Sequence, residues 1–296
     1  EVIITLNGKD YTFHIKTDKL PDDFVLPTDV TANKDELDQE LYFVTPSSSG
    51  YTAAYDVNGD VRWYLTENMI WDIQRLQNGN IMLSSNRLIN PPYYTTGLVE
   101  MDLTGKIYYE YVLPGGYHHD VFELENGNLL VASDNFESGT VEDYIVEIER
   151  DTGNIVKEID LKDILPTDQG RNQMATDYDW FHNNAVWYDR ETNSITLSGR
   201  HQDAVVNIDY NSLELNWIIG SSDGWDESYQ EYFLTPTGDD FEWQWAQHAS
   251  MILPNGDVFI FDNGNNRSKT EENSISASDN YSRGVIYRIN QVDQTI

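Results

Sequence analysis

The stretch FEWQWAQHASMILPNGDVFIFDNGNNR, residues 241–267, decides the fold of this chain. It contains one apolar run, a tight turn at Asn255-Gly256 and a second apolar run, and His248 stands where the first run begins. Asn-Gly between two alternating apolar runs is the strongest short signal for a β-hairpin. The segment therefore predicts two antiparallel strands, the first of which starts with a histidine.

The same layout occurs three more times upstream, which indicates an internal repeat. The other copies are WDIQRLQNGNIMLSSN from Trp71, HDVFELENGNLLVASD from His119 and HNNAVWYDRETNSITLSGR from His182, at spacings of 48, 63 and 66 residues to the next copy. A second hairpin follows each first one, so each unit has four short strands, as in a propeller blade. Stacked sandwich hairpins are the alternative, but a four-stranded repeat of this length favours blades.

We therefore expect an all-β fold. A six-bladed β-propeller should occupy residues 36–296, after a small N-terminal β module and linker in residues 1–35. Residues 41–65 read as a blade that lacks its first strand, and Ile296 falls inside the last strand of a blade. We expect the natural protein to continue beyond Ile296, so that the propeller is incomplete at this C-terminus.

The composition excludes several classes of function. The formal net charge is −33, from 18 basic and 51 acidic residues spread along the chain. Nucleic acid and anionic membranes call for a positive surface, so neither is an expected partner. The chain has no cysteine, which removes disulfides, thiolate metal sites and cysteine nucleophiles. No apolar run of about 18 residues is present, so we expect no membrane insertion.

Three of the six histidines share one repeat position, at the start of a first strand: His119, His182 and His248. Propeller blades bring equivalent positions together around a central channel. Arg200 ends the strand that should pair with the His182 strand, so it should lie at the same opening. His118 would point the other way in a regular strand and is the less favoured channel histidine. A purely structural role for a polar residue at this position is the alternative.

These residue types suit an anion site. Arginine offers a planar fork that matches sulfate or phosphate oxygens. Imidazole, with an ordinary pKa of about 6.5, can act as nucleophile or general base. Trp71 takes the histidine position in an earlier unit and could form an aromatic wall with Trp180, which would suit a flat apolar substrate group.

At these residues the chain resembles the bacterial arylsulfate sulfotransferases, which do not use the nucleotide sulfate donor PAPS. The resemblance covers essentially the whole chain. Its motifs are DWFHNN (residues 179–184) with Tyr188 and Asp189, SGRHQ (198–202), WAQH (245–248), and FDNG (261–264) with Arg267. Together these motifs are quite specific, whereas the Asn-Gly turns alone would not be.

The resemblance implies that a sulfuryl group moves from a phenolic sulfate ester to another phenol by a ping-pong route through a sulfohistidine. His248 matches the histidine that is sulfated. His182 and Arg200 match residues that bind the sulfuryl group and assist proton transfer, and Asn184 matches a nearby polar contact. The repeat register adds His119 as a further channel histidine. The resemblance implies neither a cofactor nor a bound metal.

The partners implied are a small phenolic sulfate donor and a phenol acceptor, and a homodimer is one assembly open to the chain. An extracytoplasmic location fits both the family and the acidity. Two other functions stay open: a propeller lyase or hydrolase in which His119, His182 and His248 hold a divalent metal, and a propeller that binds its ligand without catalysis. Arg200 at the same opening argues against a cation there.

Overall fold

The computed structural model describes residues 2–13, 19–28, 30, 40–46, 50–67, 69, 71, 73–89 and 94–296. Within these residues the regular structure is almost entirely β-strand, and the helices are three short 3-10 turns: η1 (Leu161–Asp163), η2 (Glu227–Tyr232) and η3 (Glu271–Asn273). None of these described helices is long and apolar enough to cross a membrane. The chain divides into two compact units, Glu1–Asn68 and Met69–Ile296. The boundary that we expected at residue 35 lies outside the described residues and stays a prediction.

The described part of the first unit contains two small antiparallel sheets. One is the hairpin of β1 (Val2–Leu6) and β2 (Lys9–Phe13), and the other is the meander of β3 (Tyr42–Val44), β4 (Ala53–Tyr55) and β5 (Val61–Tyr64). The hairpin turns at Asn7 and Gly8, whose φ angles of 53° and 75° are those that a type I′ turn requires. The meander occupies the segment in which we expected a blade that is one strand short.

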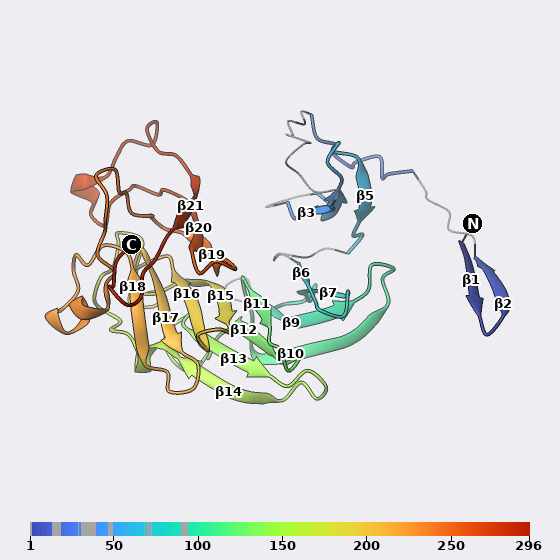
Figure 1. Ribbon diagram of the computed structural model, residues 1–296, viewed down its shortest axis with the longest axis horizontal. Coiled ribbons are helices and arrows are strands. Elements are labelled where there is room, and N and C mark those ends of the chain that lie inside the picture. Colours follow the sequence, from blue (N-terminus) through green and yellow to red (C-terminus); the bar gives the residue numbers. More distant parts are fainter. Residues whose placement is uncertain are drawn as a thin grey trace. The chain divides into compact units, whose positions relative to one another are not determined.

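The described part of the second unit forms four antiparallel sheets that follow one another in chain order (Figure 1). The first contains β6 (Gln74–Arg75), β7 (Ile81–Ser84), β8 (Leu88–Ile89), β9 (Tyr94–Met101) and β10 (Ile107–Tyr117). The second contains β11 (Val121–Glu123), β12 (Leu129–Ser133), β13 (Tyr144–Ile148) and β14 (Ile155–Asp160). The third contains β15 (Asn183–Asp189), β16 (Ser194–Gly199), β17 (Ala204–Asp209) and β18 (Leu215–Ile219), and the fourth β19 (His248–Ile252), β20 (Val258–Asp262) and β21 (Arg283–Tyr287).

The inner strands of the second and third sheets are apolar on both faces because each of these two sheets is packed between two others. Every residue of β12 and β16 is buried, whereas the outer strand β14 alternates between buried or half-buried and exposed positions. Hydrophobic clusters fill the spaces between successive sheets. The cluster between the second and third sheets includes Leu130, Ile145, Leu197 and Val206, all of which are fully buried. This packing on both faces is typical of propeller blades.

The turn between the first and second strands repeats in detail, as the sequence predicts. In three sheets a glycine of the Asn-Gly pair adopts a left-handed φ of 85° to 87°, and the asparagine side chain accepts a hydrogen bond from the backbone N–H two residues later. These pairs are Asn78-Gly79, Asn126-Gly127 and Asn255-Gly256. Asparagine and glycine suit such turns because the one can bond its own backbone and the other tolerates positive φ.

Polar contacts also join successive sheets. Arg150, in the turn after β13, donates to Glu100 of β9 at 2.7 Å and to Glu123 of β11. Asn184 of β15 donates from Nδ2 to the carbonyl oxygen of Gln247 at 2.9 Å. These contacts fix how one sheet meets the next, and therefore where the ends of the inner strands lie.

The chain thus has an all-β fold with a β-propeller arrangement. Five sheets of blade type are found among the described residues: β3–β5 in the first unit and four in the second. We expected six blades. The sixth blade and the assignment of the N-terminal hairpin to a separate module stay predictions.

Candidate active site

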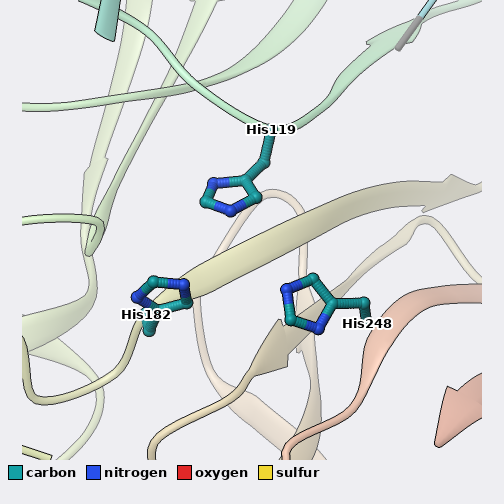
Figure 2. A group of neighbouring side chains, drawn as sticks. All are labelled: His119, His182 and His248. Atoms are coloured by element: carbon teal, nitrogen blue, oxygen red, sulfur yellow. The ribbon is translucent and has the colours of Figure 1, made fainter. Parts of the chain in front are cut away.

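Three imidazoles from three successive sheets meet in the second unit (Figure 2). His119 precedes β11, His182 precedes β15, and His248 opens β19. The ring centroids lie 5.3 Å apart for His119 and His182, 6.0 Å for His119 and His248, and 6.3 Å for His182 and His248. One nitrogen of each ring lies within 4.8 Å of the others, and each ring turns a nitrogen toward the shared space. The structure therefore brings together the three histidines that share a register in the repeat.

The backbone at two of these residues differs from the expectation. We expected each histidine to be the first residue of its strand, which holds only for His248. His119 and His182 have φ angles of 54° and 58°, in the left-handed region and outside the extended conformation of a regular strand. Regular pairing therefore starts after them. A non-glycine residue there costs about 1–3 kcal/mol, and such conformations cluster at functional sites.

His182 is held between two carboxylates. Its Nδ1 donates a hydrogen bond to Oδ2 of Asp179 at 2.9 Å and lies 2.6 Å from Oε2 of Glu142. Burial alone would lower the pKa of His182, but Asp179 and Glu142 raise it to about 9. Burial raises the pKa of Asp179, but the hydrogen bonds and charges of His182 and His201 lower it more, so the pKa of that carboxyl lies well below its usual range. His182 is therefore an imidazolium at neutral pH, and its Nε2 is left to face the shared space.

His248, in contrast to His182, has a lowered pKa. Burial, the positive charge of Arg200 and the charge of His182 lower the pKa of His248 to about 4. Its Nδ1 meets the side-chain amide of Asn263, whose Nδ2 lies 2.8 Å away, and the carbonyl oxygen of Ala246 at 3.4 Å. Its Nε2 faces the other imidazoles (Figure 2). At neutral pH this ring is uncharged, which a nitrogen nucleophile requires.

His119 is also neutral. Burial, followed by the charges of His118 and His182, holds its pKa well below the ordinary value. Its Nδ1 lies 3.0 Å from Nδ1 of His118, whose Nε2 bonds the carbonyl oxygen of Ser133 at 2.9 Å. The indole of Trp71 lies against His119, with ring centroids 4.4 Å apart. His119 is thus the histidine that belongs to the cluster, and the fully buried His118 contacts Nδ1 of His119 on the side away from the shared space.

Arg200 directly follows β16, and its backbone N–H donates to the carbonyl oxygen of His182 at 3.2 Å. Among the described residues no carboxylate lies within ion-pair distance of its guanidinium, and its buried Nε has no hydrogen-bond partner. An unpaired arginine is unusual in a chain with 51 acidic and 18 basic residues. A guanidinium without a carboxylate is free to receive an anionic ligand.

Of the residues that we expected to contact substrate, Trp180 lies elsewhere and Asn184 lies beside the strand that carries His248. Trp180 is fully buried in the hydrophobic cluster, and its Nε1 donates to Oδ2 of Asp143 at 2.6 Å, so the structure does not bring it to the site. Asn184 is buried, and its Nδ2 bonds the carbonyl oxygen of Gln247, the residue before His248. Its contact with the site in this structure is through the backbone that carries His248.

The structure adds two residues that sequence reasoning missed. Asn263 follows β20, and the sequence could have indicated it. In an antiparallel pair the start of one strand lies beside the end of the next, so the end of β20 lies beside the start of β19, as Arg200 lies beside His182. The register pairs His248 with Phe261. Glu142 gave no such signal, because it lies in the turn before β13, on the neighbouring sheet. Only the packing of the sheets brings it to His182.

The arrangement suits chemistry on an anion. It combines a neutral imidazole and an imidazolium around one space, with the guanidinium of Arg200 close enough for its charge to lower the pKa of His248. Three imidazoles are also a common donor set for divalent metals, and one nitrogen of each lies within 4.8 Å of the others. The positive charge of Arg200, which lowers the pKa of His248, favours an anion over a cation in this space.

Comparison with known proteins gives one family. The family model described as Arylsulfotransferase (ASST) matches residues 27–296. Two curated relatives, both called arylsulfate sulfotransferase AssT, come from Escherichia coli O6:H1 and Lelliottia amnigena. Each is 24% identical to this chain over 83% of the chain and 51% of the relative. The chain thus spans about half the length of the curated relatives it matches.

Virginiamycin B lyase from Staphylococcus aureus is 12% identical, with a TM-score of 0.45, and the match covers 87% of this chain and 69% of the lyase.

Proposed function

The chain belongs to the arylsulfotransferase family, and from this premise we propose that it transfers a sulfuryl group from a phenolic sulfate ester to another phenol. The route is ping-pong, through a sulfohistidine at His248. The observation that supports this most is one site that joins a neutral His248 to an imidazolium, His182, and an unpaired Arg200. Each of the three has the charge that one part of the reaction needs.

In the first half-reaction the Nε2 lone pair of His248 attacks the sulfur of the donor. A nitrogen–sulfur bond forms while the bond from sulfur to the phenolic oxygen breaks. The departing oxygen takes the Nε2 proton of His182, so the first phenol leaves neutral and His182 becomes neutral. The ring of His248 then carries the sulfuryl group and a positive charge, which offsets the negative charge of that group.

In the second half-reaction the acceptor phenol gives its proton to Nε2 of His182. Its oxygen attacks sulfur, and the nitrogen–sulfur bond breaks with its electron pair returning to His248. His182 is an imidazolium again and His248 is neutral. The protein thus ends each turnover as it began, and no proton is exchanged with solvent.

The charge of each group fits its role. A phenol has a pKa near 10, as tyrosine does, so a histidine whose pKa is about 9 exchanges a proton with it at little cost. Arg200 can bind two sulfuryl oxygens in its planar fork and stabilise the charge that builds on them as the bond to oxygen breaks. The neutral ring of His119 lines the same space without a proton to donate there, because its Nδ1 faces Nδ1 of His118 and the Nε2 of His118 bonds Ser133. Trp71 offers an aromatic surface for the phenol ring.

The test uses the full-length protein with 4-nitrophenyl sulfate as donor and a phenol as acceptor. We expect release of nitrophenolate, parallel lines in double-reciprocal plots, and a sulfated histidine that can be trapped without acceptor. His248→Asn should abolish all three, and Arg200→Gln should slow them, whereas Arg190→Gln, which alters an exposed arginine, should not. Activity that survives His248→Asn would refute the assignment of the nucleophile.

The same experiment separates the other two functions. Stoichiometric metal and loss of activity with a chelator would favour a three-histidine metal enzyme. Binding of aryl sulfate without turnover and without a labelled histidine would favour a non-catalytic propeller. The positive charge of Arg200 weighs against the first of these.

We propose further that the protein acts outside the cytoplasm, since this fits the resemblance and the charge of −33. Fractionation of the producing cells tests it. The division into an N-terminal β module and a propeller from residue 36, and assembly as a homodimer, are proposals of the same kind. Limited proteolysis and the mass of the protein in solution test them.

A further inference from the structure

Nucleophilic attack by His248 sets a condition on where its single ring proton lies. A neutral imidazole carries one proton, and the nitrogen without it holds the lone pair. Nε2 faces the shared space (Figure 2), so the proton must be on Nδ1 when the ring attacks. Nδ1 then needs a hydrogen-bond acceptor, and its two neighbours are the Asn263 amide at 2.8 Å and the Ala246 carbonyl oxygen at 3.4 Å.

The amide of Asn263 can present either of its two ends to Nδ1, since the two orientations fill the same space. With Nδ2 nearest, as in this structure, Nδ1 must accept, the ring proton lies on Nε2, and no lone pair faces the site. In that state Nδ1 and the Ala246 oxygen are two acceptors facing each other. With Oδ1 nearest, Nδ1 donates to both oxygens and Nε2 is free to attack.

We propose that Asn263 is a positioning residue that selects the reactive tautomer of His248, by turning its amide so that Oδ1 accepts the Nδ1 proton. This inference rests on the proposed role of His248 as nucleophile. After transfer of the sulfuryl group to Nε2, the Nδ1 proton stays in place, and the same two oxygens stabilise the positively charged ring. Asn263 touches no reacting atom and acts only through His248.

The backbone on both sides of Asn263 is fixed, so that the amide is the part left to turn. Asp262 is fully buried, and its Oδ1 accepts from the backbone N–H groups of Trp245 and Gly264, each at 2.9 Å. Its Oδ2 accepts from Arg267 at 3.1 Å and from Arg283 at 2.9 Å. The buried carboxylate thereby joins the segment that leads into His248 to the turn that carries Asn263.

Gly264 and Ser282 hold the other side of the residue. Gly264 has a φ of 71°, and a Cβ there would lie 2.0 Å from the carbonyl oxygen of Tyr281, so only glycine fits. Ser282 donates from Oγ to the carbonyl oxygen of Asn263 at 2.9 Å. A residue that selects the tautomer of His248 needs a fixed backbone and an amide that can rotate, and Asn263 has both.

An amide suits this position better than a carboxylate. At His182, Asp179 and Glu142 hold the ring as an imidazolium, which has no lone pair. A carboxylate in place of Asn263 would favour the doubly protonated ring of His248 in the same way. An amide oxygen orients the Nδ1 proton without adding a negative charge, so the ring stays neutral and nucleophilic.

The test is the tautomer of His248, read from long-range proton–nitrogen correlation spectra of protein labelled with 15N-histidine at neutral pH. Loss of one signal set in His248→Asn assigns the ring. We expect the Nδ1-protonated form in the natural protein with a bound, unreactive aryl sulfonate, a larger share of the Nε2-protonated form in Asn263→Leu, where only the distant Ala246 oxygen remains as acceptor, and both nitrogens protonated in Asn263→Asp. Asn273→Leu, an exposed change in the same connection, should leave the tautomer unchanged.

Kinetics give the second measurement. In Asn263→Leu the rate at which the histidine is sulfated should fall about tenfold or more, with the apparent affinity for donor within about twofold, because binding contacts are intact. An Nε2-protonated ring in the natural protein with the sulfonate bound, or an unchanged tautomer in Asn263→Leu, overturns the inference. The spectra do not depend on turnover, so the proposed function can fail at His248→Asn while the tautomer result is still decided.

Discussion

Replacing Asp179 by asparagine should move the charge of His182 and, with it, the pH range of the reaction. The pKa of His182 is about 9, against an ordinary 6.5, and the difference of about 2.5 corresponds to about 3 kcal/mol. At pH 8 roughly nine tenths of a group with a pKa of 9 is protonated, against roughly one thirtieth at a pKa of 6.5. Burial alone lowers the pKa of His182, so the carboxylates supply all of the increase.

Asp179→Asn leaves Glu142 as the single carboxylate at Nδ1. We therefore expect the pKa of His182 to fall by about one or more, and the alkaline limb of the pH–rate profile to move down by the same amount. Histidine signals in an NMR titration give the pKa, and the rate at which nitrophenolate is released gives the profile. Asp177→Asn is the matched control, because its side chain is almost fully exposed and pairs with Arg171.

The same substitution should change how stability depends on pH. Folding raises the pKa of His182, so its contribution to the unfolding free energy is complete below pH 6.5 and is lost as the pH rises through 9. The natural protein should lose about 3 kcal/mol over that range from this group, and Asp179→Asn should lose less. A His182 that titrates below pH 7 in the natural protein, or that does not respond to Asp179→Asn, would refute the reasoning.

Three further substitutions test the scaffold and the anion site. Arg150→Ala should lower the unfolding free energy by about 3–5 kcal/mol, because it leaves carboxylates of two sheets without their buried partner. Denaturant titrations measure this change, and the control Arg190→Ala, at an exposed arginine, should cost less than about 1 kcal/mol. Gly264→Ala should destabilise by more than about 1 kcal/mol, since it adds a Cβ at a φ of 71° and 2.0 Å from a backbone oxygen; an unchanged melting temperature contradicts this. Arg200→Gln should raise the pKa of His248 by removing a nearby positive charge, and an NMR titration without such a rise would show that the guanidinium lies elsewhere.

The sequence predicted the repeat because each unit carries its own local signals. Asn-Gly turns and alternating apolar runs depend on neighbours in the chain, and they return in the structure at Asn78, Asn126 and Asn255. Register then brought His119, His182 and His248 together, since equivalent positions of a repeat occupy equivalent positions in space. The start of each strand was less predictable, because a left-handed φ at a histidine leaves no mark in the sequence.

Residues whose role depends on packing between sheets could not be predicted from the sequence. Trp180 was expected near substrate as part of an aromatic wall with Trp71, yet its side chain is in the core. Glu142 reaches His182 from another sheet, across some 40 residues of chain. Neither spacing nor residue type indicates such a contact, so the charge of His182 could not be predicted.

The proposed chemistry depends on the positive charge of His182. One repeat position delivers both His182 and His248, so the scaffold alone makes no distinction between them. Their partners do: two carboxylates meet Nδ1 of His182, while an amide and a backbone carbonyl meet Nδ1 of His248. The first ring therefore carries a proton that it can give, and the second a lone pair that it can use. The contacts with Nδ1 give His182 its charge, whereas burial, Arg200 and His182 keep His248 neutral. Each Nε2 therefore remains open to the space between them, where the sulfuryl group would be exchanged.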